Sequence, residues 1–192
     1  MTRSVARNVG GMTLVELLIG MTLGLVATAA MTALLRTGTA AWERAGANAE
    51  VAIEAAEAVD QLTRDLRDAG YDPAAAGIAG LTVTATDRLE MTADLDGNAA
   101  IDPASEERIG YRWSAASGSL QRVVGRQSLP ILSDVASGGF RLTYFDRDGA
   151  WLDPTDPATG AATRLVTVDL ATAPRGGLAG VRISGGARLV NR

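Results

Sequence analysis

The sequence predicts an α+β fold in which a long N-terminal helix carries an antiparallel β-sheet head on its second half. Two observations support this fold class. Residues 12–69 contain no proline and keep a helical pattern, whereas the chain after residue 77 forms short apolar or alternating runs between glycine, aspartate and proline. The chain has 192 residues, so this helix leaves about 120 for one compact head.

The first half of the helix is predicted to cross a membrane. Residues 12–35 hold a single charge, Glu16, and at about 1.5 Å per residue they can cross the roughly 30 Å of hydrocarbon in a bilayer. Residues 1–11 carry Arg3 and Arg7 and no acid. This bias favours a cytoplasmic N-terminus and a head on the outer side of the membrane.

Glu16 is the unusual residue of this segment. An ionisable group in a membrane costs about 2.5–3.5 kcal/mol at the centre and less near an end, which makes it a functional candidate. A secretory signal peptide cleaved near Ala27-Thr28-Ala29 would have a shorter apolar core without an acid. A plain single-span anchor would leave Glu16 and the Gly10-Gly11 pair unexplained. Gly20 and Gly24 form a small-xxx-small pair that would let a neighbouring helix approach closely.

A basic leader that ends in Gly11, followed by Met12 and the run T-L-V-E-L-L-I, resembles the class III signal of type IV prepilins and type II secretion pseudopilins. The resemblance implies that a prepilin peptidase cleaves between Gly11 and Met12, that Met12 is N-methylated, and that Glu16 serves filament assembly. Residues 60–71, D-Q-L-T-R-D-L-R-D-A-G-Y, also resemble the end of the long helix in PilW-like minor pilins and J-type pseudopilins. The chain departs from the family pattern at Met12, where phenylalanine is usual, and at Ala33, where proline is usual.

The resemblance implies a pilin-like division into a leader at 1–11, a transmembrane helix at 12–35, its amphipathic continuation at 36–70 and a β-rich head at 71–192. The expected function is that of a minor pilin-like subunit of a type IV pilus, which is inserted in the inner membrane and then enters or primes a filament. Its partners would be the prepilin peptidase, other pilins, the assembly platform and the lipid bilayer. A type II secretion pseudopilin and a membrane-anchored adhesion or ligand-binding protein are the alternatives.

Residues 36–70 keep the helical period after the membrane segment. Charged residues such as Glu50, Glu54 and Arg64 occupy one side of this helix. Gly70 and the following Tyr71-Asp72-Pro73 predict its end, because glycine can cap a helix and proline cannot continue it. The head is expected to pack on an apolar stripe formed by Trp42, Ala45, Ala49, Ala52, Ile53, Ala56, Val59, Leu62, Leu66 and Ala69.

The head is predicted to form one antiparallel sheet. Connections at 87–88, 115–118 and 146–149 are short enough for hairpins. The proline-rich and glycine-rich segment 153–161 is expected to be a surface loop. The predicted strands are 81–86, 88–93, 108–113, 119–124, 140–145, 164–170 and 181–184.

The composition argues against catalysis. The chain has no cysteine and no histidine, which removes disulfides, thiolate nucleophiles, histidine bases and Cys/His zinc sites. The sequence contains no glycine-rich phosphate loop, and its formal net charge of −4 gives no basic footprint for nucleic acid. We therefore expect a protein that is not an enzyme and has no cofactor, with calcium as the one candidate ligand.

An acidic loop at residues 94–102 is the candidate calcium site. An EF-hand in this register would need acids at positions 92 and 103, where the chain has threonine and proline. A polar turn is the alternative, because aspartate and asparagine readily form turns. The possible ligands are Asp94, Asp96, Asn98 and Asp102.

Overall fold

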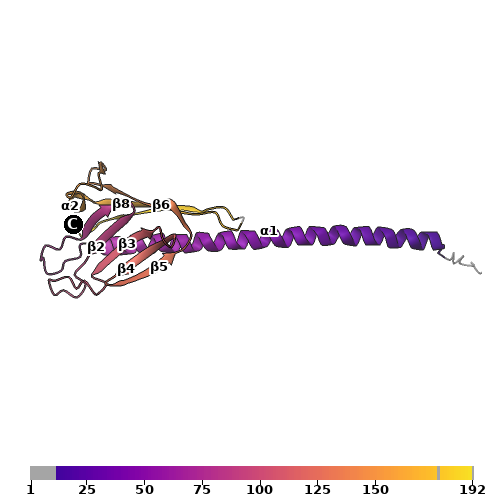
Figure 1. Ribbon diagram of the computed structural model, residues 1–192, viewed down its shortest axis with the longest axis horizontal. Coiled ribbons are helices and arrows are strands. Elements are labelled where there is room, and N and C mark those ends of the chain that lie inside the picture. The colour runs from indigo at the N-terminus through magenta and orange to yellow at the C-terminus, as the bar shows by residue number, and fades with distance from the viewer. Residues whose placement is uncertain (1–11, 177, 192) are drawn as a thin grey trace, which may run out of the picture. The chain divides into compact units, whose positions relative to one another are not determined.

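The computed structural model describes residues 12–176 and 178–191, apart from the side chain of Thr84. One long helix, α1 (Leu14–Asp68), confirms the predicted helix to within two residues at its start and one at its end (Figure 1). The helix ends where Gly70 adopts a φ of 78° and donates its N–H to the Thr92 carbonyl at 2.9 Å. The chain divides into two compact units, Met1–Gly46 and Ala47–Arg192, which are described separately below.

The second unit contains two antiparallel sheets rather than the single sheet predicted (Figure 1). The first is a meander of five strands, each paired with the next along the chain: β1 (Leu81–Ala85), β2 (Arg88–Thr92), β3 (Arg108–Ser114), β4 (Ser119–Val124) and β5 (Gln127–Leu132). The second has the order β7-β6-β8-β9, with β6 (Val135–Phe145), β7 (Trp151–Leu152), β8 (Leu165–Thr172) and β9 (Arg182–Arg188). A single-turn helix, α2 (Thr159–Ala162), precedes β8.

The antiparallel pairing and the hairpins at 115–118 and 146–149 are confirmed. The prediction missed β5 because this strand contains Pro130, which is tolerated at the edge of the sheet. It also missed the two-residue strand β7 and placed a loop where α2 forms. Strand β6 begins five residues earlier than predicted, because an irregularity between Val135 and Phe140 accommodates Gly138 at a φ of 68°.

Both sheets and the second half of α1 share one hydrophobic core. Strand β9 approaches the helix closely at Gly185, where an added Cβ atom would lie 2.5 Å from the Cγ1 atom of Val59. Only glycine allows this approach, because any side chain would push the strand away from the helix. Gly185 lies within β9, although glycine pairs usually mark turns, and this explains why the predicted strand ended too early at residue 184.

The predicted apolar stripe of α1 is partly correct. Val59, Leu62, Leu66 and Ala69 are buried as expected. Trp42 and Ile53 are exposed, at 82% and 59%, and Ala56 is exposed as well. Their place in the core is taken by Ala55 and Ala58. The error arises because this part of the helix is rich in alanine, whose small side chain gives little contrast between the two faces.

Asp65 of α1 connects the helix to the five-stranded sheet. Its Oδ2 atom accepts hydrogen bonds from the Tyr111 hydroxyl at 2.7 Å and from the Arg122 Nε at 2.9 Å. The side chains of Asp65 and Arg122 are only 16% and 12% exposed, so this ion pair is mostly buried. Burial raises the pKa of Tyr111, and the negative charge of Asp65 raises it further. The hydroxyl therefore remains a donor and helps to fix the register between helix and sheet.

Candidate functional site

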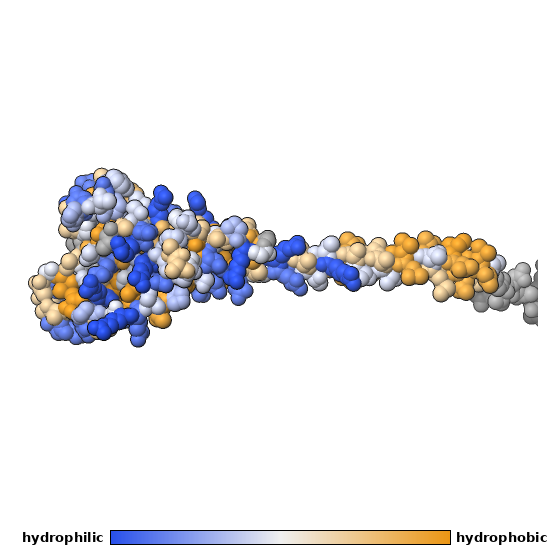
Figure 2. All heavy atoms as spheres, in the orientation of Figure 1, coloured by the Kyte–Doolittle hydropathy of each residue, from blue (hydrophilic) through white to orange (hydrophobic). Residues whose placement is uncertain are grey.

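The first candidate site is the apolar start of α1. Among the residues described, α1 is the one helix that is long and apolar enough to cross a membrane. All residues from 12 to 39 are exposed, including Leu14 at 75% and Leu34 at 72%, and Figure 2 shows this part of the helix as a nearly continuous hydrophobic band. The core helix of a soluble protein would be buried, whereas a signal sequence would meet the same criteria. An apolar surface of this extent needs lipid or protein to cover it.

Glu16 and Thr13 form a reciprocal cap at the start of α1. The backbone N–H and the hydroxyl of Thr13 donate to Oε2 of Glu16 at 3.0 and 2.9 Å. In return, the N–H of Glu16 donates to the Thr13 hydroxyl oxygen at 3.3 Å. This is the capping box arrangement, in which two backbone donors without helical partners are satisfied by side chains. The carboxylate is thus held at the first turn of the helix, next to Met12.

Glu16 lies near the helix start, as the sequence predicts, and its bond to Thr13 is an additional feature. The spacing T-x-x-E, in Thr13 to Glu16, is a sequence signature of the capping box and would have revealed it. Met12 is exposed, at 69%. The predicted cleavage position Gly11 and the rest of the segment 1–11 lie outside the described residues.

Two glycines leave open space on the apolar part of α1. A Cβ atom added at Gly20 or at Gly24 would have no heavy atom within 4 Å. The two residues are one turn apart and so lie on the same side of the helix. This side therefore remains available for close approach by another helix.

The second candidate site is the loop between β2 and β3, where Asp94 is completely buried. Its Oδ1 atom accepts the N–H groups of Gly97 and Asn98 at 2.8 and 3.1 Å, and Oδ2 accepts that of Ala99 at 2.9 Å. A buried carboxylate is tolerated only with such partners. Asp94 therefore fixes the turn that follows it.

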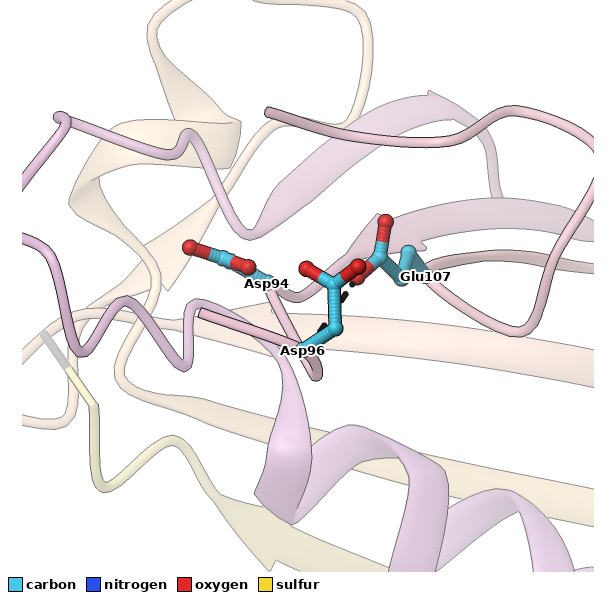
Figure 3. A group of neighbouring side chains, drawn as sticks. All are labelled: Asp94, Asp96 and Glu107. Carbon is cyan, nitrogen blue, oxygen red and sulfur yellow. Dashed lines mark hydrogen bonds between the residues drawn. The ribbon is translucent and has the colours of Figure 1, made fainter. Parts of the chain in front are cut away.

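Glu107, which the sequence analysis did not single out, serves the same loop from its other end. It is 4% exposed, and its Oε1 atom accepts the N–H groups of Leu95 and Asp96 at 3.0 and 3.3 Å. Its Oε2 atom accepts the N–H of Asp102 at 2.7 Å. Figure 3 shows Asp96 between Asp94 and Glu107, and one carboxylate oxygen of each lies within 4.8 Å of the others.

The four predicted ligands are thus only partly brought together. Among the acids, Asp94 and Asp96 join Glu107, whereas Asp102 is not a member of this group. Asn98 lies against this group, because its side-chain amide donates to Asp96 Oδ2 at 2.8 Å. The Oδ1 atom of Asp102 accepts the N–H of Ala104 at 2.9 Å. The two buried acids are satisfied by backbone donors, so the loop geometry is explained by these bonds without a cation.

No protein-family model matches the chain, and no curated protein matches its sequence. The resemblance to prepilins therefore depends on the leader, Glu16 and residues 60–71.

Proposed function

We propose that the chain is a minor pilin-like subunit that is anchored in the inner membrane by residues 12–35 and assembles into, or primes, a helical filament. The observation that carries the proposal is an exposed apolar helix with one carboxylate, Glu16, in its first turn. The antiparallel sheets on the second half of α1 are compatible with a pilin-like arrangement. The head then faces away from the cytoplasm, because Arg3 and Arg7 favour retention of the N-terminus.

Processing by a prepilin peptidase after Gly11 would create a new amine on Met12, which remains cationic when methylated. This amine and the Glu16 carboxylate both lie at the border of the apolar segment, where an unpaired charge is costly. In an assembly, Glu16 of one subunit and the Met12 amine of a neighbour neutralise each other and set the axial register. Thr13 supports this role by holding the carboxylate at the helix start in the free subunit.

Mass spectrometry of the membrane-associated protein tests the processing step. We expect a mature chain that begins at Met12 and carries one additional methyl group. A chain that begins near Ala30 would identify a secretory signal peptide and would contradict the proposal. A chain that still includes Gly11 would show that the leader is not cleaved, and a plain membrane anchor would then be the remaining interpretation.

Substitution of Glu16 by alanine tests the assembly step. We expect Glu16→Ala to insert and to be cleaved normally, because the leader and the apolar segment are unchanged, and to lose incorporation into filaments. Crosslinking and shear fractionation measure the incorporation. Glu43→Ala is the matched control, because Glu43 is an exposed acid of α1 beyond the apolar segment. Equal incorporation of the Glu16 and Glu43 variants would reject the role of Glu16.

A further inference from the structure

The outer face of the five-stranded sheet carries a basic hollow of about 1000 Å³. Arg88 on β2 is paired directly with Arg112 on β3, and Glu90 with Gly110, so these side chains share the face opposite the buried Leu89. Gly110 and Val123, which are paired between β3 and β4, also line the hollow.

The charge of the hollow is opposite to that of the whole chain. Its lining contains four arginines and one acid, Glu90, which gives a formal charge of +3 in a chain of net charge −4. Only part of this charge is compensated internally, since Arg108 pairs with Glu90 at 2.8 Å. Arg112 donates to two neutral side chains, Gln121 and Ser128. Arg126, in the turn between β4 and β5, is exposed and has no ion pair with any described residue.

The second half of α1 presents a matching acidic face. Glu50, Glu54 and Glu57 follow a spacing of four and three residues, which places them along one side of the helix. All three are exposed, and none has an ion pair within the described part of the chain. Glu54 and Glu57 also line a hollow of about 660 Å³ beside Pro130 of β5.

The acidic face and the basic hollow of one molecule cannot meet. The helix packs on the inner face of the five-stranded sheet, through the contacts of Asp65 with Tyr111 and Arg122, whereas the hollow lies on the outer face. Glu50, Glu54 and Glu57 can therefore reach only the basic hollow of another copy of the chain. Two different patches that complement each other make a heterologous interface, and repetition of such an interface builds an open helical array when it does not close into a ring.

We propose that the basic hollow docks the acidic face of α1, around Glu54 and Glu57, from a second copy of this chain. The inference rests on the proposed function and extends it, since it places more than one copy of this chain side by side in the assembly. Electrostatic complementarity of this kind sets partner choice and register. A second copy is a better match than a nucleic acid, since the net charge of −4 repels a polyanion at long range while the acids of α1 approach as a local group.

Disulfide crosslinking of the full chain in its membrane tests the docking. The chain has no cysteine, so Ile53→Cys on the acidic face and Ala104→Cys at the wall of the hollow introduce the only thiols. We expect a ladder of covalent oligomers from the double variant. Each single variant should give dimers at most. Ile53→Cys with Ser184→Cys, which lies on β9 of the other sheet, is the matched control and should give no ladder.

Charge reversal decides whether the contact is electrostatic. Arg108→Glu with Arg126→Glu changes the formal charge of the hollow from +3 to −1 and should reduce the ladder about tenfold. Adding Glu54→Arg and Glu57→Arg to the same chain should restore it. The proposal would be overturned if the two arginine-to-glutamate substitutions left the amount of ladder unchanged. It would also be overturned if Glu54→Arg and Glu57→Arg failed to restore a ladder that those substitutions had reduced. Binding of a single-stranded oligonucleotide that requires Arg108 and Arg126 would overturn it in favour of a polyanion.

A further thiol separates this test from the proposed function. Leu23→Cys, exposed on the apolar part of α1, reports contacts between N-terminal helices without involving the hollow. Retention of the Leu23 crosslink without the ladder would reject the docking alone. Loss of both crosslinks in chains that are otherwise unmodified would reject the assembly and the docking together.

Discussion

At the scale of single residues, Thr13 caps the start of α1 and holds the side chain of Glu16, the one acid of the apolar segment. The hydroxyl and the N–H of Thr13 both donate to Glu16, so the acid has a partner before any assembly takes place. For Glu16 to pair with a neighbouring subunit it must share or exchange this partner. The energy of the proposed pairing through Glu16 would therefore be the difference between two hydrogen-bonded states of this carboxylate.

Removal of the Thr13 cap should loosen the first turn of α1. We expect Thr13→Ala to cost about 1 kcal/mol at this turn, because the Glu16 N–H loses the Thr13 hydroxyl as its acceptor and the Glu16 carboxylate loses one of its donors. Thr13→Ser keeps the hydroxyl and should behave like the original chain. Amide hydrogen exchange at Glu16 and Leu17 in detergent micelles measures the effect. Equal exchange in the alanine and serine variants would show that the cap contributes nothing.

The buried ion pair of Asp65 should matter far more than an exposed pair on the same helix. Asp65→Asn leaves the Arg122 guanidinium without its buried counter-charge and should lower the free energy of unfolding by about 3 kcal/mol. Asp60→Asn is the control, since Asp60 is 76% exposed and pairs with Arg64 at 3.7 Å. For Asp60→Asn we expect the free energy of unfolding to change by less than about 0.5 kcal/mol. Urea unfolding, followed by tryptophan fluorescence, measures the free energy of unfolding of both variants. A similar decrease in the Asp65 and Asp60 variants would contradict the assigned role of Asp65.

At the scale of elements, the loop between β2 and β3 is held by two buried carboxylates. Together Asp94 and Glu107 accept six backbone N–H groups, which leaves few donors of the turn to be satisfied by water. This loop also forms a wall of the basic hollow through Pro103 and Ala104. The order of the loop and the shape of the hollow are therefore linked.

Neutralising Glu107 should destabilise this loop. We expect Glu107→Gln to lower the free energy of unfolding by about 1–3 kcal/mol, because an amide nitrogen replaces one acceptor in a buried position. Asp96→Asn, at an exposed position, is the control and should be nearly neutral. Thermal unfolding with and without calcium completes the comparison. A calcium-dependent rise of several degrees that Asp96→Asn removes would show a metal site instead of a purely hydrogen-bonded loop.

At the scale of the whole molecule, stability should fall in alkali. Burial raises the pKa of both Tyr111 and Tyr144, with Asp65 and Asp87 as the further causes. The unfolded chain loses these protons near the ordinary value of 10.0 while the folded chain retains them, so stability is complete below pH 10 and declines above it.

Tyr144→Phe isolates this effect. The Tyr144 hydroxyl is buried and has no hydrogen-bond partner among the described residues, so its removal should be nearly neutral at pH 7 and should flatten the decline above pH 10. Tyr111→Phe should instead cost about 1 kcal/mol at pH 7, because it loses the bond to Asp65, and this cost should shrink above pH 10 as the raised pKa of Tyr111 no longer opposes folding. Urea unfolding across this pH range measures both. An unchanged slope in Tyr144→Phe would contradict the raised pKa.

The sequence alone was sufficient for the helix, most strands and their antiparallel pairing, because period and turn residues are local signals. The division into two sheets was not predictable in this way, since it depends on which strands pair beyond the hairpins. Glu107 was missed because its bonds to Leu95 and Asp102 depend on the path of the folded loop. The basic hollow was not predicted for a similar reason. Its arginines are scattered over residues 88 to 126, and only strand pairing brings them together.

The contact between β9 and α1 has a consequence for synthesis. The helix leaves the ribosome first, but the surface around Val59 that faces Gly185 is covered only by the last of the strands. The five-stranded sheet can cover its own part of the apolar stripe earlier, but the part around Val59 stays open until β9 has been translated. The side of α1 around Val59 is therefore the last part of the core to be buried as the chain is made.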